Sequence, residues 1–237
     1  MASFVLVHGA WQAGWCWQLL VPLLNQKGHQ VSTPDLPGHG SNIYPLSEVT
    51  YDLYYKSLEQ ELMRHKEPIV LVAHSMAGLM AAPLLDQYPE KISHLYLIAA
   101  LVAQEGESLF DIVTQGGESN IPGILIENPE NNTQSLDLQK VKQAFYHQCS
   151  PEIADWAIAN LQPQPIAPFA TPIHWKASGT TLTKRTYILC EKDLNVPKQT
   201  QLNVIKRYPC KMKSIHTCHF PFLSAPNEIM EIITSET

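Results

Sequence analysis

The feature that most constrains the fold is the regular alternation of short apolar segments with segments of helical periodicity over the first hundred residues. The apolar segments are rich in β-branched residues and short, as buried strands are. They are residues 3–8, 29–34, 68–75 and 92–100. The segments with helical spacing are residues 15–28, 50–65 and 76–88. Such an alternation predicts a mostly parallel sheet with helices on both of its faces.

This alternation is interrupted once. Residues 102–180 are rich in Gln, Asn, Pro and Gly, and they hold two helix-like segments, 136–150 and 151–164. Strand-like and helix-like segments then alternate again to the end of the chain, at residues 185–190, 198–208, 210–216 and 227–235. We therefore predict one α/β domain over residues 1–237, with residues 102–180 forming a helical insertion over the sheet.

Composition excludes several classes of protein. The hydrophobic content of 45% and the charged content of 16% are typical of a globular chain. The net charge is −6 and no dense run of Lys and Arg occurs, so we do not expect a nucleic-acid partner. No apolar run is long enough to span a bilayer. The segment "MASFVLVHGA" lacks the basic start of a secretory signal, so we expect a cytoplasmic protein without a membrane partner.

The cysteines indicate neither a disulfide framework nor a metal site. They are five in number and scattered, and no two are spaced as C-x-x-C. Structural zinc sites need closely spaced ligand pairs, which are missing here. We therefore expect free thiols in a reducing compartment and no metal.

A candidate nucleophile lies in the segment "LVAHSMAGL", between a strand-like and a helix-like segment. A serine exposed on a sharp strand-to-helix turn needs small neighbours two residues before and after it. Here these are Ala73 and Ala77 instead of the usual glycines, and Gly78 follows. The strand, turn and helix context favours Ser75 as the nucleophile. The competing interpretation is a helix N-cap, a common role of serine.

A serine nucleophile needs a histidine base and an acid that orients it, in the chain order Ser, acid, His. His219 follows the last strand-like segment by a few residues, and His216 is its closest competitor. The acid should follow the preceding strand, where Asp193 is our choice and Glu191 the alternative. We therefore predict that Ser75, Asp193 and His219 form a catalytic triad.

The oxyanion of an acyl-transfer reaction needs two backbone N–H donors. One should come from Met76, the residue after the nucleophile, and the other from the loop after the first strand, "HGAWQAGW". Gly9 allows the backbone to approach closely, and Ala10 supplies the second N–H. Trp11 in the same loop is expected in the core and in the pocket wall.

These motifs resemble those of the plant methylesterase and hydroxynitrile lyase branch of the α/β-hydrolase superfamily and its bacterial esterase relatives. The matching segments are "FVLVHGAWQAGWCW", "VAHSMAGL", "YHQCSPE", "YILCEKDLNVP" and "HTCHFPFLSAP". The resemblance covers nearly the whole chain and implies an α/β-hydrolase fold with residues 102–180 as a cap. It implies the triad and oxyanion roles given above. Members often dimerise, and the resemblance extends that expectation to this chain.

Two positions bear on the reaction. Lyases of this family carry Thr in the first loop and Lys after the catalytic histidine, where this chain has Gly9 and Phe220. A phenylalanine supplies no positive charge to a leaving cyanide, which favours ester hydrolysis. The chain also departs from many relatives at Gln12, Ala13, Ala73 and Cys218, so its pocket is expected to differ from theirs.

The sequence therefore predicts a serine carboxylic-ester hydrolase that needs no cofactor. We expect Gly9, Trp11 and Phe220 to contact a small, largely apolar or aromatic ester, with Phe145 and Trp156 either in the cap core or in the pocket. Two alternatives remain open at this point. One is a lyase of the same fold, and the other is a receptor that binds a small molecule with little turnover.

Overall fold

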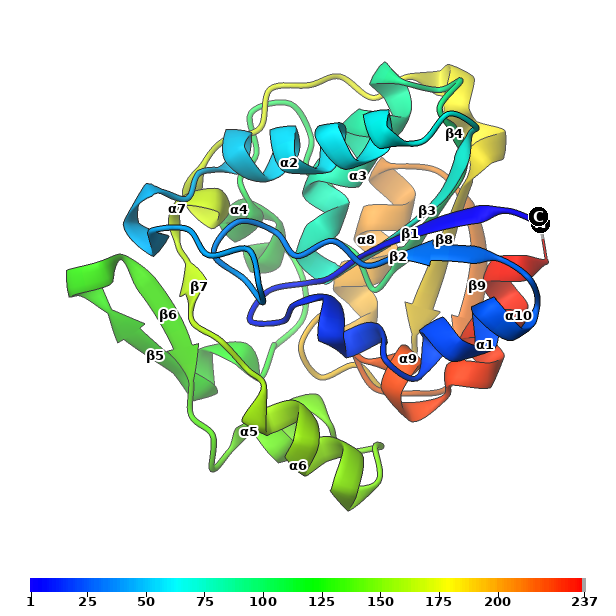
Figure 1. Ribbon diagram of the computed structural model, residues 1–237. Coiled ribbons are helices and arrows are strands. Elements are labelled where there is room, and N and C mark those ends of the chain that lie inside the picture. Colours follow the sequence, from blue (N-terminus) through cyan, green and yellow to red (C-terminus); the bar gives the residue numbers. More distant parts are fainter. Residues whose placement is uncertain (236–237) are drawn as a thin grey trace.

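The structure, a computed structural model, describes residues 1–235 of the 237. Within them, six strands form one sheet in the order β2-β1-β3-β4-β8-β9, and every neighbouring pair is parallel. The strands are β1 (Ser3–Val7), β2 (Gln30–Ser32), β3 (Ile69–His74), β4 (Ile92–Ile98), β8 (Arg185–Cys190) and β9 (Lys211–Ile215). The sheet and the flanking helices in Figure 1 confirm the predicted fold class.

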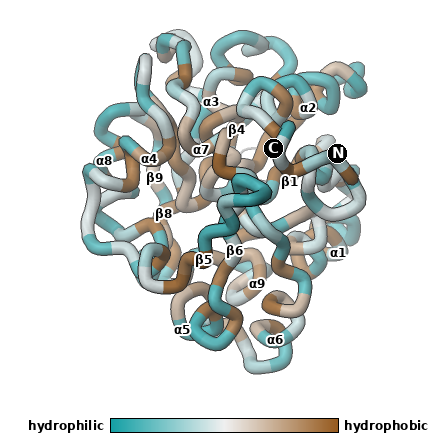
Figure 2. Tube along the Cα trace, turned by 90° about the vertical axis from the view of Figure 1, so that its left-hand side faces the viewer, coloured by the Kyte–Doolittle hydropathy of each residue, from teal (hydrophilic) through white to brown (hydrophobic). Residues whose placement is uncertain are grey.

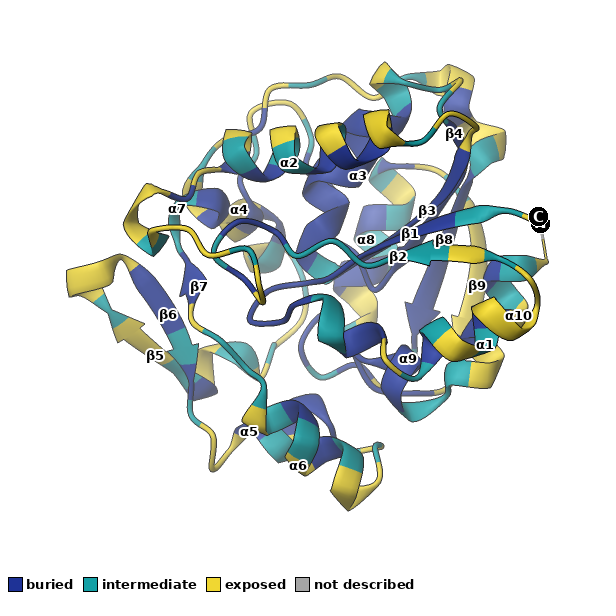
Figure 3. Cartoon of the chain, in the orientation of Figure 1, coloured by how far each residue is buried: buried dark blue, intermediate teal, exposed yellow. Residues whose placement is uncertain are grey.

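The central strands are buried because helices cover both faces of the sheet, which is why they are continuously apolar. Residues 4–7 of β1 and all of β3 are buried, and both strands are dark in Figure 3. In Figure 2 the hydrophobic residues concentrate toward the centre of the molecule, and the peripheral loops are mostly hydrophilic.

Helices enclose the sheet from both of its faces. They are α1 (Leu20–Gln26), α2 (Tyr51–Arg64), α3 (Gly78–Gln87), α8 (Lys198–Arg207), α9 (Pro221–Ser224) and α10 (Pro226–Thr234). Figure 1 shows α1 and α10 together on one face, with α2 and α3 on the other. The Thr50 side chain accepts a hydrogen bond from the Leu53 N–H at 3.2 Å and caps α2.

The insertion is not purely helical, which corrects that part of our prediction. Its helices are α4 (Leu109–Thr114), α5 (Val141–Phe145), α6 (Pro151–Ala159) and α7 (Ala167–Ala170). Three short strands form an antiparallel sheet beside them: β5 (Leu125–Asn128), β6 (Thr133–Leu136) and β7 (Gln164–Pro165). These strands are too short and too polar for an alternating pattern to be recognised. The turn between β5 and β6 contains Asn132 in the left-handed conformation, with a φ of +51°.

Parallel strands place their carboxyl ends at one edge of a sheet. The loops that follow β1, β3, β8 and β9 carry Ala10, Ser75, Asp193 and His219 respectively, so the topology gathers these residues at one edge. In Figure 1 the insertion (β5 to α7) lies beyond this same edge. No helix within residues 1–235 is long and apolar enough to cross a membrane.

Candidate active site

Ser75 lies on a sharp turn between β3 and α3. Its φ is +53°, a left-handed conformation that is costly for a residue with a side chain. The surrounding structure holds this conformation, since the Leu101 N–H donates to the Ser75 carbonyl at 3.0 Å. Ala73 and Ala77 are fully buried on either side. A Cβ at Gly78 would come within 2.5 Å of the Leu101 oxygen, so only glycine fits there.

The N-cap interpretation of Ser75 is wrong. Ser75 is the first residue of a 3-10 turn (Ser75–Ala77), and the residue that caps α3 is Ala77. Among the described residues, neither His74, which is the N-cap of this turn, nor Ala77, which is the N-cap of α3, makes a side-chain capping hydrogen bond. The serine is therefore held in a strained turn for a reason other than capping.

His219 and Asp193 form a buried pair. His219 Nδ1 lies 2.5 Å from Asp193 Oδ2, and the two residues are only 4% and 5% exposed. The other carboxylate oxygen, Oδ1, accepts the backbone N–H groups of Asn195 at 2.8 Å and Val196 at 2.9 Å. These two bonds fix the carboxylate, which in turn fixes the imidazole with Nδ1 protonated and leaves Nε2 as the free basic nitrogen.

The two competing candidates, His216 and Glu191, pair with each other at the surface. His216 Nδ1 lies 2.8 Å from Glu191 Oε2, and the side chains are 68% and 32% exposed. A solvated pair of this kind contributes little and is poorly placed to act in a buried site. The structure thus brings Asp193 and His219 together and leaves Glu191 and His216 as a separate surface pair.

His74 joins the serine turn to the histidine loop. Its Nε2 lies 2.9 Å from the backbone oxygen of His219, so this nitrogen carries the proton and donates it to that oxygen. The two rings are 4.5 Å apart between centroids. Burial holds the pKa of His74 well below its ordinary value, so the ring is neutral. Because His74 precedes Ser75 in the chain, this bond ties the serine turn directly to His219.

His8 orients the loop that follows β1. Its Nε2 accepts the Leu36 N–H at 3.1 Å, so the proton sits on Nδ1, which donates to the Gly9 carbonyl at 2.8 Å. Burial lowers the pKa of His8 to about 4 and keeps it neutral. In a trans peptide the C=O and N–H point in opposite directions, so this bond also sets the direction of the Ala10 N–H.

Gly9 packs tightly against the serine turn. A Cβ at this position would lie 2.8 Å from His74 Nδ1 and 2.9 Å from Ser75 Cβ. No real Cβ tolerates such contacts with buried groups, so this close approach requires glycine. The loop after β1 therefore packs directly against the serine turn.

A cavity of about 580 Å³ opens over the serine. The core contributes Ala10, Trp11, Ser75 and Met76 to its lining. The insertion contributes mostly apolar side chains, among them Leu109, Phe110, Val113, Ile121, Leu125 and Phe169. Cavities of this size and character accommodate small organic molecules.

Trp11 lines this cavity as predicted, whereas three other aromatic residues do not. The indole N–H of Trp11 donates to the backbone oxygen of Gln134 at 2.9 Å, and this bond connects the loop after β1 to β6. The described lining residues do not include Phe220, Phe145 or Trp156. Phe220 is 1% exposed and packs behind His219 against Phe145, which corrects its assignment as a substrate contact.

The cap residues that line the cavity are the ones that sequence reasoning missed. Leu109, Phe110 and Val113 lie on α4 at the spacing of one helical face. The signal was present in the segment "SLFDIVT", a capped apolar turn in which Ser108 accepts the Asp111 N–H. Nothing in that pattern says that its apolar face covers a distant serine.

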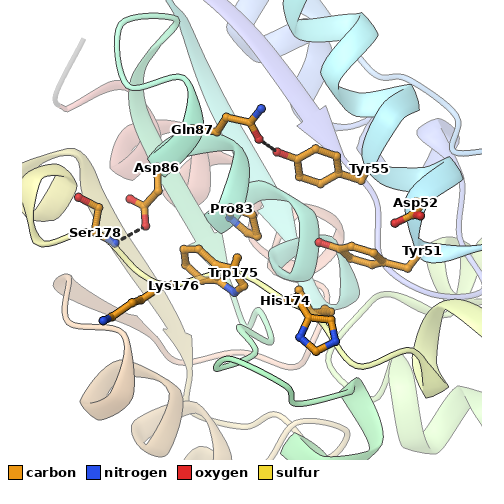
Figure 4. Close-up of a pocket in the computed structure, with 11 residues that line it drawn as sticks. Tyr51, Asp52, Tyr55, Pro83, Asp86, Gln87, His174, Trp175, Lys176 and Ser178 are labelled. Atoms are coloured by element: carbon orange, nitrogen blue, oxygen red, sulfur yellow. Dashed lines mark hydrogen bonds between the residues drawn. The ribbon is translucent and has the colours of Figure 1, made fainter.

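A second depression of about 450 Å³ lies between α2, α3 and residues 173–178 (Figure 4). Its polar groups connect these elements to one another. Tyr55 donates to Gln87, and the Ser178 N–H donates to Asp86 Oδ2 at 2.7 Å. Ser75 is not among the described residues that line this depression. We therefore place the candidate active site at the cavity over Ser75.

Comparisons with known proteins agree with this architecture. The family model described as "Alpha/beta hydrolase family" matches residues 4–232. Putative methylesterase 15, chloroplastic, of Arabidopsis thaliana is 28% identical over 97% of this chain and 55% of that protein. Polyneuridine aldehyde esterase of Rauvolfia serpentina is 29% identical over 97% of this chain and 93% of that protein. These matches confirm the resemblance found in the motifs.

A solved structure shows the same fold. The crystal structure of a pyrethroid hydrolase from Sphingobium faniae JZ-2 superposes with a TM-score of 0.85 and 26% identity. The alignment covers 98% of this chain and 95% of the other. The chain nevertheless spans only about half the length, 55%, of two Arabidopsis methylesterases that it matches.

Proposed function

This chain belongs to the alpha/beta hydrolase family, and we propose that it is a carboxylic-ester hydrolase with Ser75 as its nucleophile. The observation that carries the proposal is the buried His219–Asp193 pair, which His74 connects to the strained serine turn. Relatives named methylesterase, aldehyde esterase and pyrethroid hydrolase support ester hydrolysis as the reaction class.

In the proposed mechanism, Ser75 Oγ attacks the ester carbonyl carbon while His219 Nε2 accepts the hydroxyl proton. The N–H groups of Ala10 and Met76 donate to the oxygen that becomes negatively charged. His219 then transfers its proton to the leaving alcohol, and an acyl group remains on Ser75. Water releases the acid by the same sequence of proton transfers. Asp193 stays ionised throughout and stabilises the imidazolium.

The cavity supports a small, largely apolar or aromatic ester as the substrate. Its walls are built from side chains such as Leu109, Phe110 and Phe169, which offer contact area but few polar partners. An anionic substrate would lose part of its hydration there, and Glu118, which also lines the cavity, is itself acidic. The expected homodimer and the cytoplasmic location stay predictions, and the Arabidopsis relative is chloroplastic by its name.

The lyase alternative is less well supported by the same geometry. A threonine in place of Gly9 would put its Cβ into His74 and Ser75, so the loop as built leaves no room for that side chain. Phe220 is buried in an aromatic cluster and cannot present a charge to the cavity. No specific observation favours the receptor alternative.

The test is hydrolysis of a panel of p-nitrophenyl and aryl methyl esters by the native protein, Ser75→Ala and Ser119→Ala. Ser119 lines the same cavity, but its hydroxyl is used in a bond to the Asn195 carbonyl at 2.7 Å. We expect turnover to disappear in Ser75→Ala and to stay within severalfold of native in Ser119→Ala. Equal activity of the native protein and Ser75→Ala on every ester would refute the proposal.

A further inference from the structure

Trp11, the residue after Ala10, has a strained backbone that the insertion holds in place. Its φ is +60°, in the left-handed region that is costly for a residue with a bulky side chain. The Trp11 N–H donates to Gln164 Oε1 at 3.3 Å, and the Gln162 N–H donates to the Trp11 carbonyl at 3.1 Å. These bonds hold the two peptide groups that flank the Trp11 Cα. Two residues of the insertion therefore maintain the strained conformation.

The antiparallel sheet of the insertion makes a third bond to the same residue. The indole N–H of Trp11 donates to the backbone oxygen of Gln134 on β6, and Gln134 is the register partner of Gln164 on β7. The backbone and the side chain of Trp11 are thus bonded to two paired strands. Trp11 is only 5% exposed, so water does not compete freely for these bonds.

Gln164 is a buried amide whose orientation is determined by its partners. The residue is 0% exposed. Its Nε2 donates to the Tyr54 hydroxyl and to the Pro165 carbonyl, both at 3.1 Å, so Oε1 is the atom that faces Trp11. The Tyr54 hydroxyl in turn lies 2.8 Å from His39 Nε2. Since both polar atoms of the side chain have partners, the amide cannot rotate without leaving a buried group unpaired.

Ala10 is consequently held from both of its sides. The peptide group before it is fixed by His8, which donates to the Gly9 carbonyl at 2.8 Å. The peptide group after it carries the Trp11 N–H, which Gln164 holds. Peptide groups are planar, so fixing both of them determines the φ and ψ of Ala10 and leaves its N–H no freedom of direction.

We propose that Gln164 is a positioning residue for the oxyanion hole, acting through the Trp11 backbone on the Ala10 N–H. The inference rests on the proposed function, in which this N–H donates to the developing oxyanion. The insertion then does more than cover Ser75, because it supplies a bond that keeps a donor of the core in its reactive direction. Loss of one oxyanion donor lowers kcat by about 10²–10³, and misdirecting a donor should cost part of that factor.

The first measurement does not depend on enzyme activity. Gln164→Met keeps the length of the side chain and removes its hydrogen bonds, and amide hydrogen exchange followed by NMR reports on the Trp11 N–H. We expect this N–H to exchange at least about tenfold faster in Gln164→Met than in the native protein, while the amides of β3 keep their protection. Equal exchange of the Trp11 N–H in the two proteins would overturn the proposal.

Gln164→Asn gives the same comparison with a variant that stays polar. Its amide is one methylene shorter and falls short of a bond that is already 3.3 Å long in the native protein. The Trp11 N–H should therefore lose protection in this variant as well. Native protection in Gln164→Asn would contradict the role of the Gln164 oxygen, whether or not Gln164→Met folds.

The second measurement separates positioning from a general loss of structure. Gln164→Met should lower kcat on p-nitrophenyl esters by about ten- to a hundredfold while KM stays within about threefold of native. A boronic acid forms a tetrahedral adduct with the nucleophilic serine and places an oxygen where the oxyanion develops. Its affinity should fall by about the same factor as kcat, since it resembles the transition state.

Thr186→Val is the matched control. Thr186 is 2% exposed, and its hydroxyl lies 2.8 Å from His94 Nε2, near the amino ends of β8 and β4 and so at the sheet edge opposite to Ser75. The substitution removes a buried hydrogen bond as Gln164→Met does. We expect a lower melting temperature in both variants, but native kcat and native boronic-acid affinity in Thr186→Val.

Three results would refute the positioning role. They are native kcat in folded Gln164→Met, a higher KM with kcat unchanged, and a lower kcat without weaker binding of the boronic acid. Failure of the proposed function gives a different pattern. In that case the native protein hydrolyses no ester, although the exchange of the Trp11 N–H still responds to Gln164→Met.

Discussion

Replacing Asp193 by asparagine separates the proposed mechanism sharply from its alternatives. In the native protein Asp193 Oδ1 accepts two backbone N–H groups, at 2.8 and 2.9 Å, while Oδ2 faces His219 Nδ1. An asparagine keeps the two backbone bonds only if its oxygen takes the Oδ1 position, because its amide nitrogen cannot accept a hydrogen bond. The NH₂ group then points at His219 Nδ1.

This arrangement changes the tautomer of His219. Nδ1 must become an acceptor, so the proton moves to Nε2, which is the nitrogen that should take the Ser75 proton. A histidine in the wrong tautomer lowers kcat by about 10⁴, which corresponds to roughly 5 kcal/mol of lost transition-state stabilisation. Since the backbone bonds to Asn195 and Val196 survive, we expect the fold and the melting temperature to change little.

Glu191→Gln is the matched control for Asp193→Asn. Glu191 lies in the same loop, and its carboxylate pairs with the exposed His216 at 2.8 Å. A surface pair of this kind contributes up to about 1 kcal/mol, and it is remote from the candidate base. We expect kcat of Glu191→Gln to stay within about twofold of native.

The assay is the initial rate of p-nitrophenyl ester hydrolysis over a range of substrate concentrations, with circular dichroism and thermal melting as checks on folding. The reasoning is refuted if folded Asp193→Asn keeps more than about a tenth of the native kcat, against the 10⁴-fold loss expected. It is also refuted if Glu191→Gln loses as much activity as Asp193→Asn. Either result would remove Asp193 from the proposed role.

Three further predictions concern the loops around Ser75. His74→Ala removes the bond to the His219 carbonyl and should lower kcat by about ten- to a hundredfold with KM nearly unchanged. His74→Gln should recover part of the lost kcat. Equal steady-state kinetics in His74→Ala and the native protein would contradict this role of His74. Gly9→Ala forces contacts with His74 and Ser75, so kcat should fall by a factor of about 10² or more while the protein still folds. A near-native kcat would show that the loop after β1 is not confined at Gly9. The pKa of His8 is about 4 in the folded protein and about 6.5 in the unfolded chain. Between pH 4 and pH 6.5 the unfolded chain therefore binds more protons at His8 than the folded protein does. Stability should thus be retained above pH 6.5 and fall by about 3 kcal/mol as the pH drops to 4; denaturant unfolding with a free energy that is flat over this window would disprove it.

Local patterns predicted the main architecture because each of them is determined by neighbours in the chain. The strand before Ser75 is recognisable from its β-branched run, and the turn is recognisable from the small residues at Ala73 and Ala77. The capping of α2 by Thr50 depends on a hydrogen bond to Leu53, three residues away. Such features can be predicted without knowledge of the tertiary structure.

The insertion shows where local patterns stop being sufficient. Its strands β5 to β7 are two to four residues long, and β7 pairs with β6 across a long stretch of chain. The role of Phe220 was misjudged for a related reason. Its position next to His219 suggested a pocket contact, but a backbone turn directs the ring away from the cavity into a cluster with Phe145 and Tyr146. Adjacency in sequence does not determine the direction of a side chain in a loop.

By itself, the sequence determined the fold class, the order of strands and helices outside residues 102–180, and which loops carry the candidate serine, acid and histidine, because these depend on periodicity and on the geometry of parallel sheets. The tertiary structure paired Asp193 with His219 in the interior and Glu191 with His216 at the surface, and this difference favours the first pair in the proposed mechanism. It also decided which side chains of the insertion cover the serine. Those outcomes depend on contacts between segments that are far apart in the chain, and no local pattern encodes them.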